Sequence, residues 1–483
     1  MVDIGKNLWI MRFAKIKKPL IYGHIAVKKQ GRTKKGEITM KKIFSVFLAL
    51  TMVLSLAACG ATKGTEESTT NSSESTSVKF ALGTALTKET DLKNDDGVVM
   101  LKEKYELPQL ELQYEDGSVC TDDDHSEELA ICKTFNDKIA QEATEFDSTS
   151  EESLEVAKTQ YADLDDESKS SWTNYSQEIT IESTYQTDGL LSVLLSGYEY
   201  TGGAHPFSYT KSWNFDLTTG EFITYDNLTN NDNPLGYNLS TAIVSVISDK
   251  IYEDDLDEQY FEDFQETLDD LSTNATIYFS KDGLVATFDA YVLGAYALGA
   301  QTFTVPYENF YYALSEHNQS LLDVSSESIV ISDYYATQLL WAWFNMSLPP
   351  IDSSAEEVTS DDGTVLYRVS LGNITSVAGV KELLCKHVSE ELAEQWMSEG
   401  KFVDVDGALY CTYGERGSDI TIGDIDYKVE FSGNSGNLTQ TVHYLEFAED
   451  TNEAKDSGKT EDFVYPFTLS DGHAIFSAFP CPF

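Results

Sequence analysis

Basic residues are scarce in this chain. Its 483 residues include 33 Lys and Arg against 81 Asp and Glu, which gives a formal net charge of −48. Nucleic acid binding needs a basic surface that contacts phosphates, so we expect no nucleic acid partner. The same charge disfavours adhesion to anionic lipid and would steer a cationic partner toward the protein. Solubility alone accounts for such a charge equally well.

Metal and redox motifs are also missing. No two cysteines have the Cys-x-x-Cys spacing, so a zinc ribbon or a thioredoxin-like motif has no support. The acidic run at residues 254–258 could offer carboxylates to calcium, but it lacks the Asp-x-Asp-x-Asp-Gly loop with a distant Glu. A solvated helix face explains that run better. We therefore expect no metal and no cofactor.

Residues 40–58 combine a basic start, a short apolar run and small residues before Cys59. These features are typical of a secretory signal, since the apolar run is too short to span a membrane comfortably. Leu56-Ala57-Ala58-Cys59 resembles the lipobox of bacterial lipoproteins, which implies that Cys59 carries the lipid. An ordinary signal peptide with a chance cysteine is the alternative. Residues 1–39 are predicted to be an over-extended gene start, with a basic cytoplasmic tail as the alternative.

The chain after residue 58 is more acidic still. Residues 1–58 hold 12 Lys and Arg and 2 Asp and Glu, so 21 basic and 79 acidic residues follow, a net charge of −58. The remaining 425 residues suffice for two or three domains. Besides Cys59 the chain has an odd number of cysteines, which cannot all pair internally. The sequence allows several alternatives: a Cys120–Cys132 bridge, a Cys385–Cys411 or a Cys411–Cys481 bridge, or five reduced thiols.

Composition divides this part of the chain into three segments. Residues 59–89 are assigned to a lipid anchor and a disordered linker, because residues 61–78 hold almost no apolar side chain and cannot bury enough surface to order themselves. A first folded domain is expected at residues 90–322. A second is expected at residues 326–483.

The first domain has the sequence pattern of an α+β fold. Apolar residues at helical spacing predict two amphipathic helices, at residues 129–146 and 154–164. Later segments alternate as strands do, with Asp188-Gly189 as a hairpin turn. This order predicts an antiparallel sheet with helices on one face. The remaining predicted elements are strands at 177–185, 190–200, 208–217, 277–279, 284–288 and 302–305, and helices at 239–252 and 254–271.

One stretch, residues 198–226, organises the chain. Two runs of alternating aromatic and polar residues flank Gly202-Gly203-Ala204-His205-Pro206, and the second run closes at a Thr219-Gly220 turn. The two glycines let the backbone pass close to a neighbour, and Gly203 is expected in a conformation closed to β-branched residues. His205 and Asp216 are the best candidates for a general base and its orienter. No nucleophile accompanies them, and a histidine between strands is more often structural.

The residues 198–205 read Tyr-x-Tyr-Thr-Gly-Gly-Ala-His, and residues 214–220 read Asn-Phe-Asp-Leu-x-Thr-Gly. Together with residues 225–228 they resemble the extracellular domain of RsiV-type anti-sigma factors, which also precedes the catalytic domain in some peptidoglycan deacetylases. A second block, residues 283–307, is similar to the closing strands of that family, so the resemblance covers about residues 95–320. It implies a non-catalytic binding module whose candidate binding residues are Tyr200, Gly202, Gly203, Ala204, His205 and Tyr296.

Two departures from the family pattern matter. Pro206 stands where relatives often place glycine, which stiffens the loop. The metal-binding Asp and the paired His motifs of the deacetylase domain have no counterpart in this sequence. We therefore expect this protein not to be an enzyme.

Residues 326–483 are predicted to start with a helix at 332–346, followed by two short helices and a run of strands. Ser389 is expected to cap the second short helix. This order is typical of cystatin-like or NTF2-like folds. Residues 383–384, 388–394, 405–410, 467–469 and 475–476 resemble the IseA-type inhibitors, which block DL-endopeptidases of the bacterial cell wall. The shared patterns are common ones, and a structural domain without a known partner is the alternative.

These features together predict a lipid-anchored protein on the extracellular face of a Gram-positive cell membrane, with two non-catalytic binding domains. The expected partner is a cationic cell-wall hydrolase, such as lysozyme or a DL-endopeptidase, and the protein would act as its sensor or inhibitor. The alternative is a protein that binds or modifies peptidoglycan itself. No cytoplasmic sigma-binding domain precedes a membrane span, so an anti-sigma role is not expected.

Overall fold

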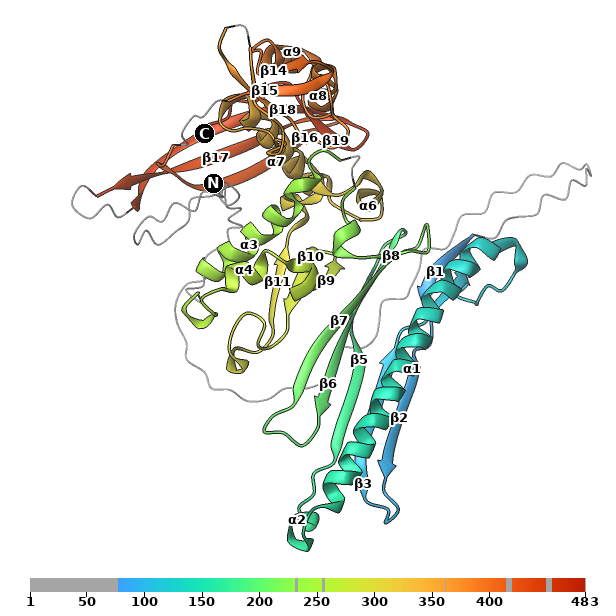
Figure 1. Cartoon of the computed structure of the whole chain (residues 1–483). Helices are drawn as coiled ribbons and strands as arrows, with labels where there is room; N and C mark the ends of the chain where they lie inside the picture. Colours follow the sequence, from blue (N-terminus) through green and yellow to red (C-terminus); the bar gives the residue numbers. More distant parts are fainter. Residues whose placement is uncertain are drawn as a thin grey trace, which may run out of the picture. The chain divides into compact units, whose positions relative to one another are not determined.

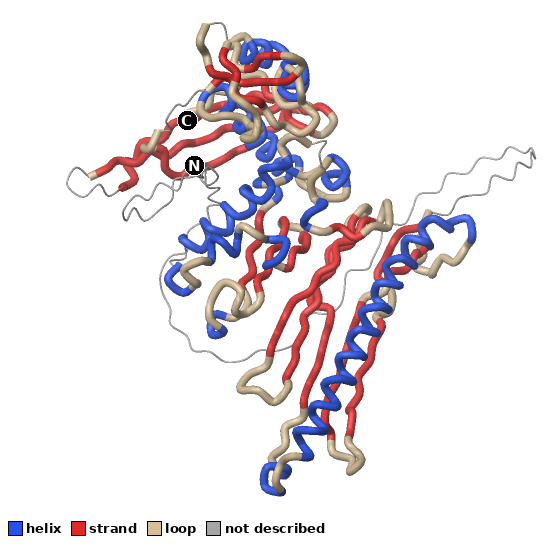
Figure 2. Tube along the Cα trace, in the orientation of Figure 1, coloured by secondary structure: helices blue, strands red, loops and turns tan. Residues whose placement is uncertain are grey.

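The computed structural model describes residues 77–482, apart from 231–232, 254–256, 361, 414–418 and 449–453. It is a mixed α+β structure with several sheets, which confirms the predicted fold class (Figures 1 and 2). The predicted gene start, the signal segment, Cys59 and the greater part of the linker lie outside the described residues. Among the described helices, none is long and apolar enough to cross a membrane.

The first region is built on a six-stranded sheet of order β2-β3-β5-β6-β7-β8. β3 and β5 run parallel, because the chain returns through the long helix α1 (Ser126–Ala162) before β5 begins, and the other neighbours are antiparallel. Figure 1 shows α1 running along β2 and β3. The strands are β2 (Leu86–Lys93), β3 (Val99–Leu107), β5 (Tyr175–Gln186), β6 (Leu190–Tyr200), β7 (Phe207–Asp216) and β8 (Phe222–Ile223).

Ordered structure begins earlier than the sequence predicted. Strand β1 (Val78–Leu82) pairs with β4 (Leu110–Tyr114), and β2 also begins before residue 90. Val78, Phe80 and Leu82 pack against the core under α1. The predicted linker boundary at residue 89 is therefore wrong, because these few apolar side chains gain a partner surface from residues far along the chain.

The two predicted amphipathic helices form one helix, α1. The predicted helices left residues 147–153 between them, but α1 contains no glycine or proline to end it. Ser150 is buried, and its hydroxyl donates to Gln177 Oε1 on β5 at 3.2 Å. The polar residues thus continue the helix along the sheet. A short helix, α2 (Asp166–Ser170), follows and is capped by Asp165.

The last three predicted strands of the first domain form a sheet of their own. β9 (Thr276–Ser280), β10 (Gly283–Phe288) and β11 (Gln301–Val305) are antiparallel in the order β11-β10-β9. Side chains of β7 bond the backbone of β9, since Ser212 and Asn214 both donate to Ile277 O, at 2.7 and 2.9 Å. The prediction that these strands complete one sheet is therefore wrong.

Helix α3 (Leu239–Glu253) agrees with the prediction, but the acidic helix expected after it is broken into pieces. Tyr260 forms an isolated bridge to Gly294, which no residue inside a helix could do. The pieces bury Phe264, Leu268 and Leu271 in the core beneath β10. They are the 3-10 turn η4 (Asp257–Gln259) and the helices α4 (Phe264–Leu268) and α5 (Leu271–Asn274).

The second region starts with α7 (Ser326–Asn345), which buries Trp343 and Tyr334 in its largest apolar cluster. The short helices α8 (Val377–Cys385) and α9 (Glu390–Met397) follow, and Ser389 caps α9 as its sequence indicated. Two four-stranded sheets have the orders β12-β13-β15-β14 and β16-β17-β18-β19. Their strands are β12 (Val358–Thr359), β13 (Val365–Arg368), β14 (Phe402–Val405), β15 (Ala408–Thr412), β16 (Ile422–Ser432), β17 (Ser435–Phe447), β18 (Ala454–Ser470) and β19 (His473–Phe476).

Short elements connect these parts. One helix, α6 (Glu316–Ser320), follows the three-stranded sheet and is capped by Ser315. The other connections contain single 3-10 turns: η1 (Asp123–His125), η2 (Tyr225–Asn227), η3 (Gly236–Asn238), η5 (Tyr296–Leu298), η6 (Tyr307–Asn309) and η7 (Tyr311–Ala313).

The cysteines in the described part of the chain form no disulfide bond, so none of the candidate bridges is formed. Burial raises the pKa of Cys132 and the pKa of Cys411, each to about 11. At neutral pH these two side chains are therefore un-ionised members of the core.

Candidate functional site

The predicted loop joins β6 to β7 and is exposed from Thr201 to His205. Gly202 has a φ of +85°, and a Cβ added there would lie 3.2 Å from the ring of Tyr175. Gly203 lies outside the left-handed region, and the nearest atom to an added Cβ is 3.7 Å away. The prediction that Gly203 has a backbone conformation closed to β-branched residues is therefore wrong. Gly202 is the residue whose position requires glycine.

His205 lies on the ring of Tyr296, so the structure brings these two predicted site residues together. Their ring centroids are 3.9 Å apart and the planes are inclined by 21°. Tyr296 also donates its hydroxyl to Pro206 O at 3.1 Å. Tyr291, which the sequence analysis did not select, places its hydroxyl 3.3 Å from His205 Nε2. We call His205, Tyr291 and Tyr296 the aromatic loop cluster.

Tyr291 and Tyr296 belong to the connection between β10 and β11, and Asp289 fixes the start of this connection. Asp289 Oδ1 accepts from the backbone N–H of Thr210 at 3.0 Å and from its hydroxyl at 2.9 Å. Burial raises the pKa of Asp289 above its usual value. Tyr291 has a φ of +74°, an uncommon conformation for a residue with a side chain. The connection is thus held in one conformation that keeps the Tyr291 ring 52% exposed.

Strand register decides which neighbours share the face of this cluster. Tyr198 pairs with Ser208, two residues before Thr210, so its side chain points to the same face as Thr210 and Asp289. Phe207 pairs with Glu199 and points to the opposite face, where its ring stacks near Tyr209. Tyr198 is 39% exposed and therefore adds to the apolar surface beside the cluster. Tyr200 is half-buried, Ala204 is exposed, and neither belongs to the aromatic loop cluster.

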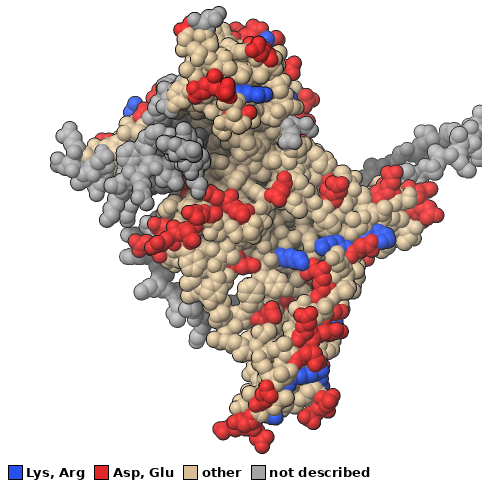
Figure 3. All heavy atoms as spheres, viewed as in Figure 1, with Lys and Arg blue, Asp and Glu red and all other residues tan. Residues whose placement is uncertain are grey.

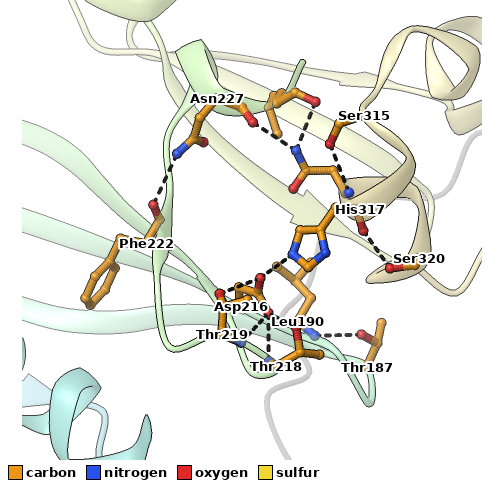
Figure 4. A network of polar contacts seen from close by, with 12 residues as sticks. Thr187, Leu190, Asp216, Thr218, Thr219, Phe222, Asn227, Ser315, His317 and Ser320 are labelled. Atoms are coloured by element: carbon orange, nitrogen blue, oxygen red, sulfur yellow. Dashed lines mark hydrogen bonds and ion pairs between the residues drawn. The ribbon is translucent and has the colours of Figure 1, made fainter. Parts of the chain in front are cut away.

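Asp216 has a different partner from the one predicted. It ends β7 at the end opposite His205, and its Oδ2 lies 2.5 Å from Nε2 of His317 on α6 (Figure 4). The proposed pairing of His205 with Asp216 as base and orienter is therefore wrong. Nine strand steps separate Asp216 from the loop end of β7, a distance of about 30 Å at roughly 3.3 Å per residue.

The surroundings of Asp216 indicate a structural role. Its carboxylate accepts from the backbone N–H groups of Thr218 and Thr219 at 2.7 and 3.1 Å, and from both hydroxyls at 2.7 Å. Burial alone would raise the pKa of Asp216, but the hydrogen bonds from Thr218, His317 and Thr219 outweigh it and hold the pKa below its usual value. The bonds from Thr218 and Thr219 close the turn after β7, and His317 fastens Asp216 to α6 (Figure 4).

A second buried acid, Asp333 on α7, was not predicted. Its Oδ1 lies 3.0 Å from Nδ1 of His473, and its Oδ2 accepts from the backbone N–H of Ala474 at 2.7 Å. The bond to Asp333 raises the pKa of His473. His387 is buried nearby, and burial lowers its pKa to about 3. No sequence motif marks these residues, since the contacts join positions far apart in the chain.

The described residues contain no group of three or more His, Cys, Asp or Glu side chains placed to hold a metal ion. Residues 254–256 of the acidic run lie outside the described residues. The absence of a cofactor stays a prediction.

Two family models match adjoining parts of the first region. Residues 121–208 match the model described as "Deacetylase PdaC", and residues 226–308 match "Protein of unknown function (DUF3298)". The aromatic loop cluster takes His205 from the first match and Tyr291 and Tyr296 from the second. No curated protein matches the chain.

Two solved structures are similar to this chain. A DUF3298 family member from Bacteroides fragilis has 20% sequence identity and a TM-score of 0.34, with 50% of this chain and 94% of that chain covered. A DUF3298 family protein from Pseudomonas aeruginosa has 15% identity and a TM-score of 0.31, with 50% and 96% covered.

The two matches fit the resemblance drawn from the loop motif at residues 198–205. The PdaC match corresponds to the N-terminal module of that deacetylase, which carries no catalytic domain. Residues 121–208 are thus similar to the N-terminal module of the PdaC deacetylase and residues 226–308 to a DUF3298 domain, as in RsiV-like ectodomains, and domains of this kind are cell-wall-associated.

Proposed function

We propose that this chain is a non-catalytic, lipid-anchored surface protein that binds a cationic cell-wall hydrolase, either lysozyme or a DL-endopeptidase. It would serve as a sensor or an inhibitor of that enzyme. The observation that carries the proposal is the aromatic loop cluster of His205, Tyr291 and Tyr296. The rings of His205 and Tyr291 are exposed, the ring of Tyr296 beneath them is half-buried, and neighbouring contacts fix all three in position.

Exposed and preorganised aromatic side chains suit protein recognition. Their side chains are already ordered in the free protein, so they lose less conformational entropy on binding and more of the contact energy contributes to affinity. Tyrosine is enriched among the residues that dominate interfaces, because its ring buries a large area and its hydroxyl finds a partner. His205 Nδ1 faces Pro206 O at 3.1 Å and Nε2 faces Tyr291, so both ring nitrogens have neighbours that orient the imidazole.

Charge supports the choice of partner. The net charge of −48 complements a cationic enzyme and accelerates its association. A catalytic role is disfavoured by geometry, since His205 contacts only tyrosine side chains and a backbone carbonyl, with no carboxylate or nucleophile among its bonded partners in the described chain. The contacts of His205 position a recognition surface rather than a reacting group.

The test is binding of hen egg-white lysozyme and of a DL-endopeptidase to the immobilised protein. Tyr291→Ala and His205→Ala remove parts of the aromatic loop cluster, and Phe431→Ala serves as a control because Phe431 is 45% exposed in the second region. We expect each cluster variant to weaken binding by about tenfold or more, as for hot-spot truncations, and the control to bind like the unmodified protein. Absence of binding to either enzyme at micromolar concentration would reject the proposal.

Peptidoglycan itself is the second candidate target. Exposed tyrosine rings can also stack against sugars, and the first family match is named after a deacetylase. Cosedimentation with insoluble peptidoglycan separates the candidates. Retention on the wall that is lost in Tyr291→Ala, together with no binding of either enzyme, would favour this alternative.

A further inference from the structure

A second exposed segment adjoins the aromatic loop cluster. It follows α3 and covers residues 257–263, including the turn η4 and Phe261, which is 41% exposed. Tyr252 at the end of α3 is 37% exposed. Large apolar side chains are therefore open to solvent here as well as at Tyr291. Neighbouring exposed aromatic residues are typical of interaction surfaces.

Backbone bonds fasten this segment to the connection that carries the cluster. The N–H of Phe261 donates to Leu293 O at 2.9 Å, and Tyr260 forms an antiparallel bridge with Gly294. The hydroxyl of Tyr260 also donates to Gln301 Oε1 at 3.0 Å. The backbone of Phe261 is thus bonded two residues from Tyr291, so the segments that carry these two exposed side chains are fastened together.

Gly294 permits this close approach. A Cβ added at Gly294 would lie 2.5 Å from the side chain of Leu298 and 3.1 Å from Gln259 O. A side chain at this position would push the two backbones apart. Gly294 therefore maintains the link between residues 257–263 and the connection that carries Tyr291 and Tyr296.

The carboxylates around Phe261 have no basic partner among the residues that the structure describes. Asp257, Glu258, Glu262 and Asp263 are exposed, and none of them takes part in an ion pair within the described chain. They also form no metal-binding group with other described residues. Figure 3 shows acidic side chains gathered on the surface over α3 and α4. Their charge is available to an external cation.

We propose that Phe261 and Tyr291, with the carboxylates of Glu258, Glu262 and Asp263, form one docking surface for a basic protein. This inference rests on the proposed function and assigns a surface of this chain to the hydrolase. Lys and Arg side chains of the partner would meet both carboxylates and aromatic faces, which attract cations by charge and through the ring quadrupole. An anionic membrane is repelled by the same carboxylates.

Neutralisation of the acidic segment tests the assignment. The variant Glu258→Gln, Glu262→Gln, Asp263→Asn keeps side-chain size and raises the net charge by three. The control Glu356→Gln, Glu382→Gln, Asp424→Asn makes the same charge change at exposed positions of the second region. Binding of hen egg-white lysozyme to the full chain is measured at low and at physiological salt, and circular dichroism confirms that each variant is folded.

We expect the first variant to weaken lysozyme binding at least tenfold and the control less than twofold. Phe261→Ala should raise the dissociation rate several-fold and leave association nearly unchanged, since the ring acts after encounter. Equal losses in both charge variants would overturn the docking surface and leave the proposed function intact, because only total charge would then matter. No binding by the unmodified protein would remove the proposed function and this inference together.

Discussion

The imidazole of His205 lies against the phenol ring of Tyr296 with 3.9 Å between their centroids, although the two residues come from different loops and different family matches. The contact shows that the loop after β6 and the connection after β10 form one surface. It also places the Gly-Gly-Ala-His motif where an external partner can reach it.

The two glycines of the motif should respond differently to substitution. Gly202→Val should lower the free energy of unfolding by roughly 1–3 kcal/mol, because its φ of +85° and the nearby Tyr175 ring exclude a β-branched residue. Gly203→Val should cost less than about 1 kcal/mol, since its backbone is outside the left-handed region. Urea denaturation of both variants gives the comparison. A larger loss in Gly203→Val would contradict the assignment.

Replacement of His205 should affect partner binding but not the stability of the fold. The side chain is exposed, so His205→Ala should change the free energy of unfolding by less than about 1 kcal/mol. Loss of the stacked ring should still weaken partner binding. Thermal denaturation beside a lysozyme titration measures both effects. An unfolded His205→Ala variant with a folded Gly202→Val variant would mean that the loop is organised by the histidine instead.

Salt should slow association with a cationic hydrolase. Charge steering is screened beyond about 8–10 Å at physiological ionic strength, so the association rate should fall as salt rises while dissociation changes much less. The net charge of −58 after residue 58 motivates this expectation. A salt series with immobilised protein measures both rates. An association rate that is independent of salt would remove the electrostatic part of the proposal.

Cys59 lies outside the described residues, and its role stays a prediction. Cys59→Ala should release the protein into the medium or leave it unprocessed, because the lipid would have no attachment site. Metabolic labelling with a radioactive fatty acid, with Cys385→Ala as a control at an exposed thiol, tests this. Unchanged labelling of the Cys59 variant would show that the lipid is carried elsewhere or is absent.

Acid should destabilise the second region through His387. Its folded-state pKa of about 3 is below the unfolded value of 6.5, so its contribution to stability is present above pH 6.5 and is lost as the pH falls toward 3. At pH 5 the loss is about 2 kcal/mol relative to pH 7. We expect His387→Gln to show a smaller loss over this interval in urea denaturation. The same pH dependence in both proteins would mean that another group is responsible.

Local patterns in the sequence predicted much of the first sheet. The alternation at residues 177–217 and the Asp188-Gly189 turn correspond to β5, β6 and β7, because strand period and turn chemistry act over a few residues. The cap at Ser389 was predicted for the same reason, since it bonds the N–H of Leu392 only three positions away. The family resemblance also marked His205 in the loop motif and Tyr296 in the second block, but it did not predict that the two side chains are in contact.

Only the tertiary structure decided which of these residues meet. Strand β1 is ordered because it pairs with β4, and the helix expected near Tyr260 is interrupted by its bridge to Gly294. Asp216 contacts His317 instead of His205. Tyr291 entered the site because Asp289 bonds Thr210 on another sheet. Each of these contacts joins segments far apart in the chain, and periodicity within a short window carries no information about such pairs. The sequence by itself determined the net charge and the strands, turns and caps that depend on local patterns. Long-range packing determined which side chains form the proposed recognition surface.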